Sequence, residues 1–185
     1  MTSETTSLST RSRRGGRADA PSRWTGSERL TRAIVQRVRS ATVDVGDERV
    51  ADIKSGVVVL VGVGANDRPE DGERLAAKIA GLRIFEEGGK MQRALADVGG
   101  AVLAVPQFTL YGDARHGRRP DFTAAAPSEL GKRLFEGFCG ALRGGGVEVR
   151  QGRFGATMVM RLEADGPVTL ALSTDGWRES ELGSS

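Results

Sequence analysis

The sequence has little of the side-chain chemistry on which most hydrolases depend. Among 185 residues there is one histidine, His116, and one cysteine, Cys139. A single cysteine excludes a disulfide within the chain and is typical of a reducing cytosol, so we expect a cytoplasmic protein. No His, Cys and Asp cluster has ligand spacing, so we expect no metal and no other cofactor. Any Ser-His-Asp or Cys-His set would have to use His116.

Long hydrophobic runs are also lacking. No apolar stretch approaches the roughly 18–20 residues that cross a bilayer, and the N-terminus has no apolar region of the secretory-signal type. We therefore expect no contact with a membrane. The composition, 38% hydrophobic and 28% charged, suits one globular domain with a hydrophobic core.

The excess of positive charge belongs to the N-terminal segment. The chain has 27 Lys and Arg against 24 Asp and Glu, and residues 1–29 hold six of the arginines and three of the acids, which leaves 21 of each sign afterwards. Residues 1–29 are poor in aliphatics, so we expect a disordered extension before a domain at 30–176 and a flexible tail at 177–185. An RNA-binding arm, a solvated tail and a start codon placed too far upstream are alternative explanations of the extension.

Hydrophobic patterning predicts a mixed α+β domain, because strands come first and then alternate with two helices. The second helix carries an apolar stripe from Leu130 to Leu142, with Ser128 as its expected N-cap. The predicted strands are 31–45, 48–53, 56–63 and 99–112, followed by two or three between 147 and 174, and the helices are 68–85 and 128–146.

Two short motifs have a functional and a structural interpretation. "GVGAND", which ends at Asp67, resembles the opening of a dinucleotide fingerprint, but the third glycine is missing and a tight strand-to-helix turn is the alternative. Thr109 is a candidate nucleophile, but a threonine hydroxyl needs a base and the sequence shows none, so a strand residue is the alternative.

Three further motifs contain proline. Pro106 removes a backbone donor from a predicted strand, which a chain tolerates where a site requires it. Arg118 and Arg119 precede a proline and either contact phosphate or are merely solvated. Gly166-Pro167, in "DGP", reads as a turn, but it would also present bare carbonyls to an ammonium group.

The ordered set of motifs from Arg32 to Thr174 resembles the D-aminoacyl-tRNA deacylase family. The stretches that carry the resemblance are "AIVQRVRSATVDV", "GVVVLVGV", "KIAGLRIFEEGGKM", "VGGAVLAVPQFTLYGD", "GRRPDFTAAAP", "GRFGATMVM" and "DGPVT". The resemblance implies a β-barrel-like sheet flanked by two main helices. It also implies a homodimer that hydrolyses the ester between a D-amino acid and the 3′-terminal adenosine of tRNA.

The resemblance also implies a role for particular residues. Gly166 and Pro167, joined by a cis peptide bond, would reach into the partner's site and capture the α-amino group, with Arg37 orienting them. Their rigid position would reject L-amino acids by steric clash. Glycine, which has no side chain, would be accepted, so glycine mischarged on the tRNA for alanine would also be hydrolysed. The catalytic strand is Gln107, Phe108 and Thr109, whose N–H groups would stabilise the oxyanion. Pro106 and Met158 would line the substrate pocket, and Arg118 and Arg119 would contact the tRNA.

Two residues depart from the family pattern. Pro106 stands where the family usually has serine, and a sibling subfamily with "PQATL" accepts an L-amino acid. Ala164 stands where the family often has asparagine. Relaxed chirality with action on L-Ala-tRNA is therefore one alternative. A non-catalytic RNA-binding module and a nucleotide-using enzyme are the others.

Overall fold

The computed structural model describes residues 31–115 and 117–174. The predicted N-terminal extension, the C-terminal tail and His116 lie outside the described residues, so the expectations about them stay predictions. The strands are β1 (Arg32–Val45), β2 (Glu48–Ile53), β3 (Gly56–Gly62), β4 (Phe85–Glu87), β5 (Lys90–Arg93), β6 (Ala101–Pro106), β7 (Glu148–Gln151) and β8 (Val159–Ser173). The helices are α1 (Pro69–Ala80) and α2 (Ser128–Gly144), with short 3-10 helices η1 (Ala96–Val98) and η2 (Phe108–Tyr111).

β1 is the strand on which the main sheet is built. One of its edges pairs with β3 over the first half and with β2 over the second half, both antiparallel. Its other edge pairs antiparallel with β8 over most of its length. β3, β6 and β7 run parallel to one another, which gives the order β2-β1-β3-β6-β7 with β8 outside β1.

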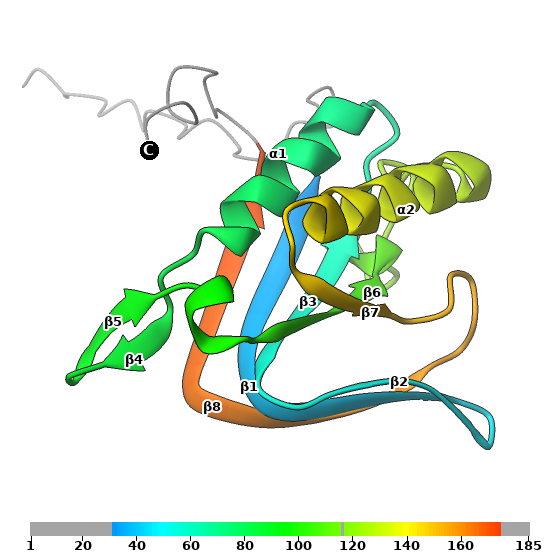
Figure 1. Cartoon of the computed structure of the whole chain (residues 1–185). Helices are drawn as coiled ribbons and strands as arrows, with labels where there is room; N and C mark the ends of the chain where they lie inside the picture. The colour runs from blue at the N-terminus through cyan, green and yellow to red at the C-terminus, as the bar shows by residue number, and fades with distance from the viewer. Residues whose placement is uncertain (1–30, 116, 175–185) are drawn as a thin grey trace, which may run out of the picture.

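The main sheet curls because β1 and β8 bend together (Figure 1). The pairing of β1 with β8 shifts register between Gln36 and Ser40. Each shift exchanges the inward and outward faces of a strand. Ala33 and Val35 therefore face the core beneath the helices, whereas Ala41 and Val43, also at odd-numbered positions, face a second core on the other side of β3 and β6.

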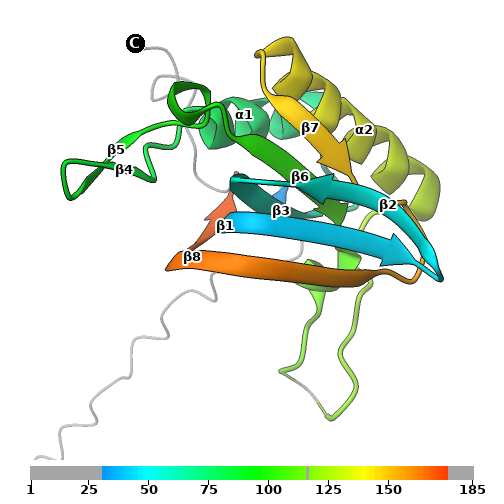
Figure 2. The ribbon, with the colours of Figure 1, turned by 60° about the horizontal axis from the view of Figure 1, so that its bottom comes forward.

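β3 and β6 lie between these two cores and are buried on both faces, as their uniformly apolar sequences predict. α1 and α2 cover one face of the sheet (Figure 2), and β1 with β2 curls over the other face. The expected mixed α+β fold, with a barrel-like sheet and two main helices, is confirmed. None of the described helices is long and apolar enough to cross a membrane.

The helix boundaries correct two predictions. α1 ends at Ala80 with Gly81 as its C-cap, and Phe85 belongs to β4, so the first helix is shorter than the predicted 68–85. Ser128 is the first helical residue of α2 rather than its cap, because the N-cap is Pro127 and no side chain caps the helix. Leu134, Phe138 and Leu142 of the predicted stripe are buried, as expected.

The fourth predicted strand, 99–112, also ends early. β6 stops at Pro106, and Gln107 leads into η2, whereas the sequence predicts a strand through to 112. Tyr111, the last residue of η2, is buried. The residues from Phe108 to Tyr111 therefore form a tight helical turn at the carboxyl end of β6, the position where ligands bind in sheets with parallel strands.

Candidate active site

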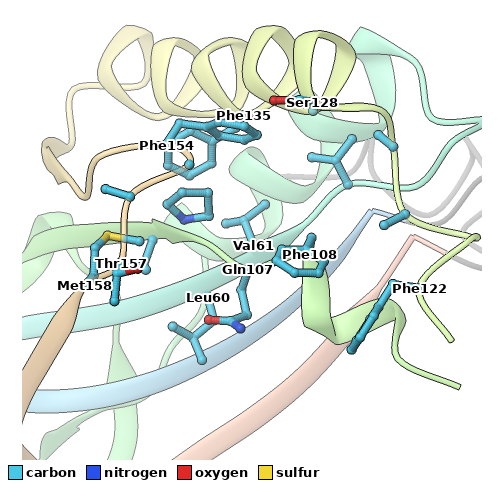
Figure 3. Close-up of a pocket in the computed structure, with 18 of the residues that line it drawn as sticks. Leu60, Val61, Gln107, Phe108, Phe122, Ser128, Phe135, Phe154, Thr157 and Met158 are labelled. Atoms are coloured by element: carbon cyan, nitrogen blue, oxygen red, sulfur yellow. The ribbon is translucent and has the colours of Figure 1, made fainter. Parts of the chain in front are cut away.

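A pocket of about 660 Å³ lies at the carboxyl ends of β3 and β6, beneath the start of α2 (Figure 3). Its volume is in the ordinary range for small-molecule sites. Most of its lining is apolar, and the polar exceptions include Gln107, Ser128 and Thr157. Of the residues that the sequence nominates, Pro106, Gln107, Phe108 and Met158 line it together.

Pro106 explains how the pocket opens between β6 and the chain after β7. Gln107 N–H donates to the Val61 carbonyl on the β3 side, at 2.7 Å, and Gly152 N–H donates to the Ala104 carbonyl on the β7 side, at 2.8 Å. Donors alternate sides along a strand, so the N–H of residue 106 would continue the pairing toward β7. Proline has none. Pairing with β7 ends at Ala104, and the segment 154–158 turns away to form a pocket wall.

η2 presents two backbone donors beside this pocket. Its first 3-10 hydrogen bond runs from Leu110 N–H to the Gln107 carbonyl, so the N–H groups of Phe108 and Thr109 precede it. Gln107 Nε2 donates to Thr109 Oγ1. Because an amide cannot take a proton from a hydroxyl, this contact gives Thr109 no base and disfavours its role as a nucleophile.

Phe108 lies at the mouth of the pocket. It is 60% exposed, and its ring packs edge-on against Phe122 with centroids 5.3 Å apart. Both rings border the cavity on the η2 side (Figure 3). An exposed aromatic pair beside an apolar cavity is a typical platform for a flat ring in the ligand.

Gly166 and Pro167 lie inside β8 rather than in a turn between two strands. Pairing with β1 is regular before Gln36 and after Ser40, and between them Arg37 alone is opposite the four residues 165–168 of β8. These four residues form a wide bulge, within which Gly166 has φ +111° and the Gly166-Pro167 bond is cis, as the resemblance implied. Both residues are exposed.

Arg37 braces this bulge from below. It is 7% exposed, and its guanidinium donates to the carbonyls of Asp165 and Ile84. The Arg37 Nε also lies 2.9 Å from the Asp165 carboxylate, which pairs with Arg39 at 3.3 Å. Although Ala164 lacks a polar side chain, the neighbouring carboxylate thus ties the bulge to β1.

The bulge and the pocket of one chain lie apart. Arg37 pairs with Val57 of β3, whereas the pocket begins at Leu60 of that strand. Three residues of strand correspond to roughly 10 Å, and β8 lies on the opposite edge of β1 from β3. Neither Gly166 nor Pro167 lines the pocket. The structure therefore does not bring these two nominated residues together with Gln107 in one chain.

Arg118 and Arg119 lie in an exposed loop that projects from the sheet (Figure 2). Paired backbone hydrogen bonds between Asp113 and Asp121, of 2.7 and 2.9 Å, close the base of the loop. Phe122 follows at once and packs on Phe108. The loop that carries the two arginines thus begins and ends beside the mouth of the pocket, but neither arginine lines the pocket.

In the "GVGAND" segment, a backbone donor that could bind phosphate is already bound by a side chain of the same segment. Gly64 N–H donates to the Asp67 carboxylate at 2.8 Å, where a nucleotide site would offer that donor to phosphate. A Cβ at Gly62 would lie 3.1 Å from the Gln107 carbonyl, so this glycine permits η2 to pack closely. The tight turn, the second interpretation of the motif, matches this geometry.

Cys139 does not belong to the site. It is fully buried in α2, and burial raises the pKa of its thiol to about 11. Among the described residues no three His, Cys, Asp or Glu side chains are grouped so that they could hold a metal ion. The polar groups at the pocket are the side chains of Gln107, Ser128 and Thr157, with the backbone donors of η2 beside them.

The sequence analysis missed two aromatic walls of the pocket. Phe135 of α2 and Phe154 of the loop after β7 lie together across the cavity from Gln107, with ring centroids 6.3 Å apart (Figure 3). Phe135 lies one residue from the predicted apolar stripe and is read as core from sequence alone. Only the folding of α2 over the ends of β3 and β6 makes it a pocket residue.

Solved structures share this fold. The "c-Myc DNA Unwinding Element Binding Protein" is 36% identical, with a TM-score of 0.71 over 76% of this chain and 97% of that one. A protein described as a probable eukaryotic D-amino acid tRNA deacylase has a TM-score of 0.70 at 20% identity, over 78% and 99% of the two chains. The fold and the site therefore define a class of α+β proteins that have two helices packed on a curled sheet, here with an apolar pocket at the ends of its parallel strands.

Sequence comparison identifies the family. A sequence model described as D-Tyr-tRNA(Tyr) deacylase matches residues 34–173. Proteins named D-aminoacyl-tRNA deacylase from Thermotoga petrophila and Thermus aquaticus are 53% and 54% identical over 144 residues, which is 77% of this chain and 97% and 95% of theirs. The chain belongs to the D-Tyr-tRNA(Tyr) deacylase family, and the resemblance drawn from the sequence motifs is confirmed.

Proposed function

We propose that this chain is a cytoplasmic hydrolase that cleaves the ester of D-aminoacyl-tRNA to a free D-amino acid and tRNA. The family match and the relatives' names support this reaction. Water supplies the oxygen that completes the carboxylate, and its proton passes to the ribose oxygen of the leaving tRNA. The reaction needs no metal or other cofactor in this scheme.

The pocket is the proposed site of the 3′-terminal adenosine. Its apolar walls and the Phe108–Phe122 pair suit a flat base, while Gln107 supplies a polar group near the centre. Met158 and Pro106 also line the pocket. This placement sets the ester carbonyl beside η2, where the N–H groups of Phe108 and Thr109 would stabilise the negative charge that develops on its oxygen.

The observation that carries the proposal is the position of Gly166 and Pro167. Their exposed bulge lies away from the pocket of the same chain, so its carbonyls serve a pocket only across a subunit interface. A two-fold dimer would complete both pockets at once, because each subunit gives the same bulge to the other. β8 supports such an interface, since Val159 and Leu162 are 51% and 41% exposed along this edge strand.

Selection against L-amino acids follows from this geometry. Two carbonyl oxygens fixed by the Arg37 brace would accept hydrogen bonds from the α-ammonium group and so fix the remaining substituents. An L side chain would then meet the pocket wall, whereas a D side chain would point outward. Glycine has no side chain that could clash with the pocket wall, so the alanine tRNA mischarged with glycine is also a proposed substrate.

The attacking water needs a base, which the described pocket lacks as a side chain. In place of such a base, we assign the activation of the water to the 2′-hydroxyl of the terminal ribose, which lies beside the ester and can relay the proton from the water to the leaving ribose oxygen. Arg118 and Arg119 are assigned to the tRNA phosphates, because their loop projects from the pocket mouth.

The proposal is tested by comparing the release of tyrosine from D-Tyr-tRNA and L-Tyr-tRNA, together with sedimentation of the purified protein. Rapid release from the D-ester alone, by a dimer, is expected. Equal rates on the two esters would refute the chiral mechanism. A fully active monomer would refute the transfer of the bulge between subunits.

Pro106 supports one alternative, relaxed chirality with action on L-Ala-tRNA. The missing donor at Pro106 ends the pairing of β6 with β7, and both Pro106 and Met158 line the pocket. Release of alanine from L-Ala-tRNA by the natural protein, lost on Pro106→Ser, would favour this alternative over strict D-selectivity.

A further inference from the structure

We propose that Arg32, Tyr111 and Asp67 form a clamp that holds η2 in position, and that they act as positioning residues for the Phe108 and Thr109 donors. The inference rests on the proposed function, because it assigns these N–H groups to the oxyanion. None of the three side chains lines the pocket.

Arg32 contacts the buried half of η2 in two ways. Its Nη1 donates to the Leu110 carbonyl at 2.8 Å, and its guanidinium lies 4.2 Å from the centroid of the Tyr111 ring. A cation over an aromatic face is attracted by the electrons of the ring, more strongly when the pair is away from water. Arg32 is at the start of β1, so these contacts fasten η2 to the first strand of the sheet.

Asp67 lies near the hydroxyl end of the same ring. Its carboxylate is 6% exposed and accepts hydrogen bonds from Gly64 N–H at 2.8 Å and Thr31 Oγ1 at 2.9 Å. A Cβ at Gly64 would lie 2.7 Å from the Tyr111 hydroxyl and 2.9 Å from Asp67 Oδ1, so the glycine leaves room for the tyrosine and the carboxylate to meet. Burial and the Asp67 charge raise the pKa of Tyr111, which stays protonated and neutral.

Only one end of η2 is held by buried contacts. The residues whose N–H groups are assigned to the oxyanion are at its exposed end. Phe108 and Thr109 are both at the surface, whereas Tyr111 is 5% exposed. The first anchor of this turn is the hydrogen bond from Gln107 N–H to the Val61 carbonyl, at 2.7 Å. The clamp is the second anchor, and together they fix the orientation of a four-residue helix. A displacement of about 1 Å in such a group can reduce a rate by up to about 100-fold.

The inference is tested with Arg32→Met, which keeps much of the side-chain length but removes the charge and the donors. On D-Tyr-tRNA we expect kcat to fall about tenfold while KM stays within about twofold, because donors are misplaced but the pocket is intact. Arg32→Lys keeps a cation and one donor and should recover part of the lost kcat. Arg49→Met is the matched control, because Arg49 is 54% exposed and pairs with Asp44 on the β1–β2 hairpin.

A double-mutant cycle of Arg32→Met with Tyr111→Leu separates the clamp from general packing. Because the two side chains act through one contact, their losses in kcat should be strongly non-additive. If Arg32→Met does not fold, Tyr111→Leu alone carries the test, because it removes the ring beneath the Arg32 guanidinium and should lower kcat about tenfold with little change in KM.

Four results would overturn the clamp: full kcat in the variant that folds, a change in KM alone, additive losses in the cycle, or an equal loss in Arg49→Met. Failure of the natural protein to release tyrosine from D-Tyr-tRNA would instead refute the proposed function. The two failures are therefore distinguishable.

Discussion

Replacing Gly166 by alanine tests the bulge in β8 most directly. At φ +111° an L-residue is strained, and the new Cβ would lie 2.9 Å from both Arg37 Nη2 and Val168 Cγ2. These distances are shorter than ordinary contacts, so the bulge has to move. The carbonyl of residue 166 would move with it, away from the position that the Arg37 brace sets.

The cost to stability should be modest and the cost to activity large. A non-glycine residue in such a backbone conformation costs roughly 1–3 kcal/mol, against a total stability on the order of 5–15 kcal/mol for a domain. The variant should therefore fold. A shift of about 1 Å in an oxygen that orients the substrate lowers kcat/KM by about 100-fold.

The assay is tyrosine release from D-Tyr-tRNA, measured beside thermal unfolding. Gly146→Ala is the matched control, because Gly146 has φ +81° at the end of α2 with no atom within 4 Å of its added Cβ. It should lose similar stability and keep its activity. If Gly166→Ala keeps kcat/KM within about twofold of the natural protein, the carbonyls of the bulge do not hold the substrate.

Three further predictions use other parts of the molecule. Changing Arg118 and Arg119 together to serine should raise KM for tRNA and flatten its dependence on salt, since two phosphate contacts are lost; an unchanged salt slope would contradict their role. Because burial raises the pKa of Cys139 to about 11, its thiol should resist iodoacetamide at pH 8 in the folded protein; rapid alkylation with loss of activity would contradict this placement. Phe138→Ala should destabilise the domain by about 3–5 kcal/mol in urea unfolding, because this side chain is fully buried between the helices and the sheet; a loss below about 1 kcal/mol would show that the site collapses around the cavity.

Local patterns determined the elements where one environment extends along a segment. β3 and β6 are buried on both faces, and their uniformly apolar sequences predict this burial. The alternation in β1 was equally readable, although the register shift that changes its inward face near Arg37 was not. Boundaries failed where a single residue decides them. Pro106 ends β6 because it cannot donate, and Gly81 ends α1 before the predicted limit.

The sequence by itself determined the fold class, the family and the small set of motif residues, because strand periodicity and ordered motifs are properties of neighbours in the chain. Only the tertiary structure decided which of them share a cavity. It brought Gln107, Phe135 and Phe154 into one pocket and left Gly166 outside it. It also placed the Arg32 guanidinium over the Tyr111 ring. Such contacts depend on which strands pair and in what register, and no local signal in the chain specifies either.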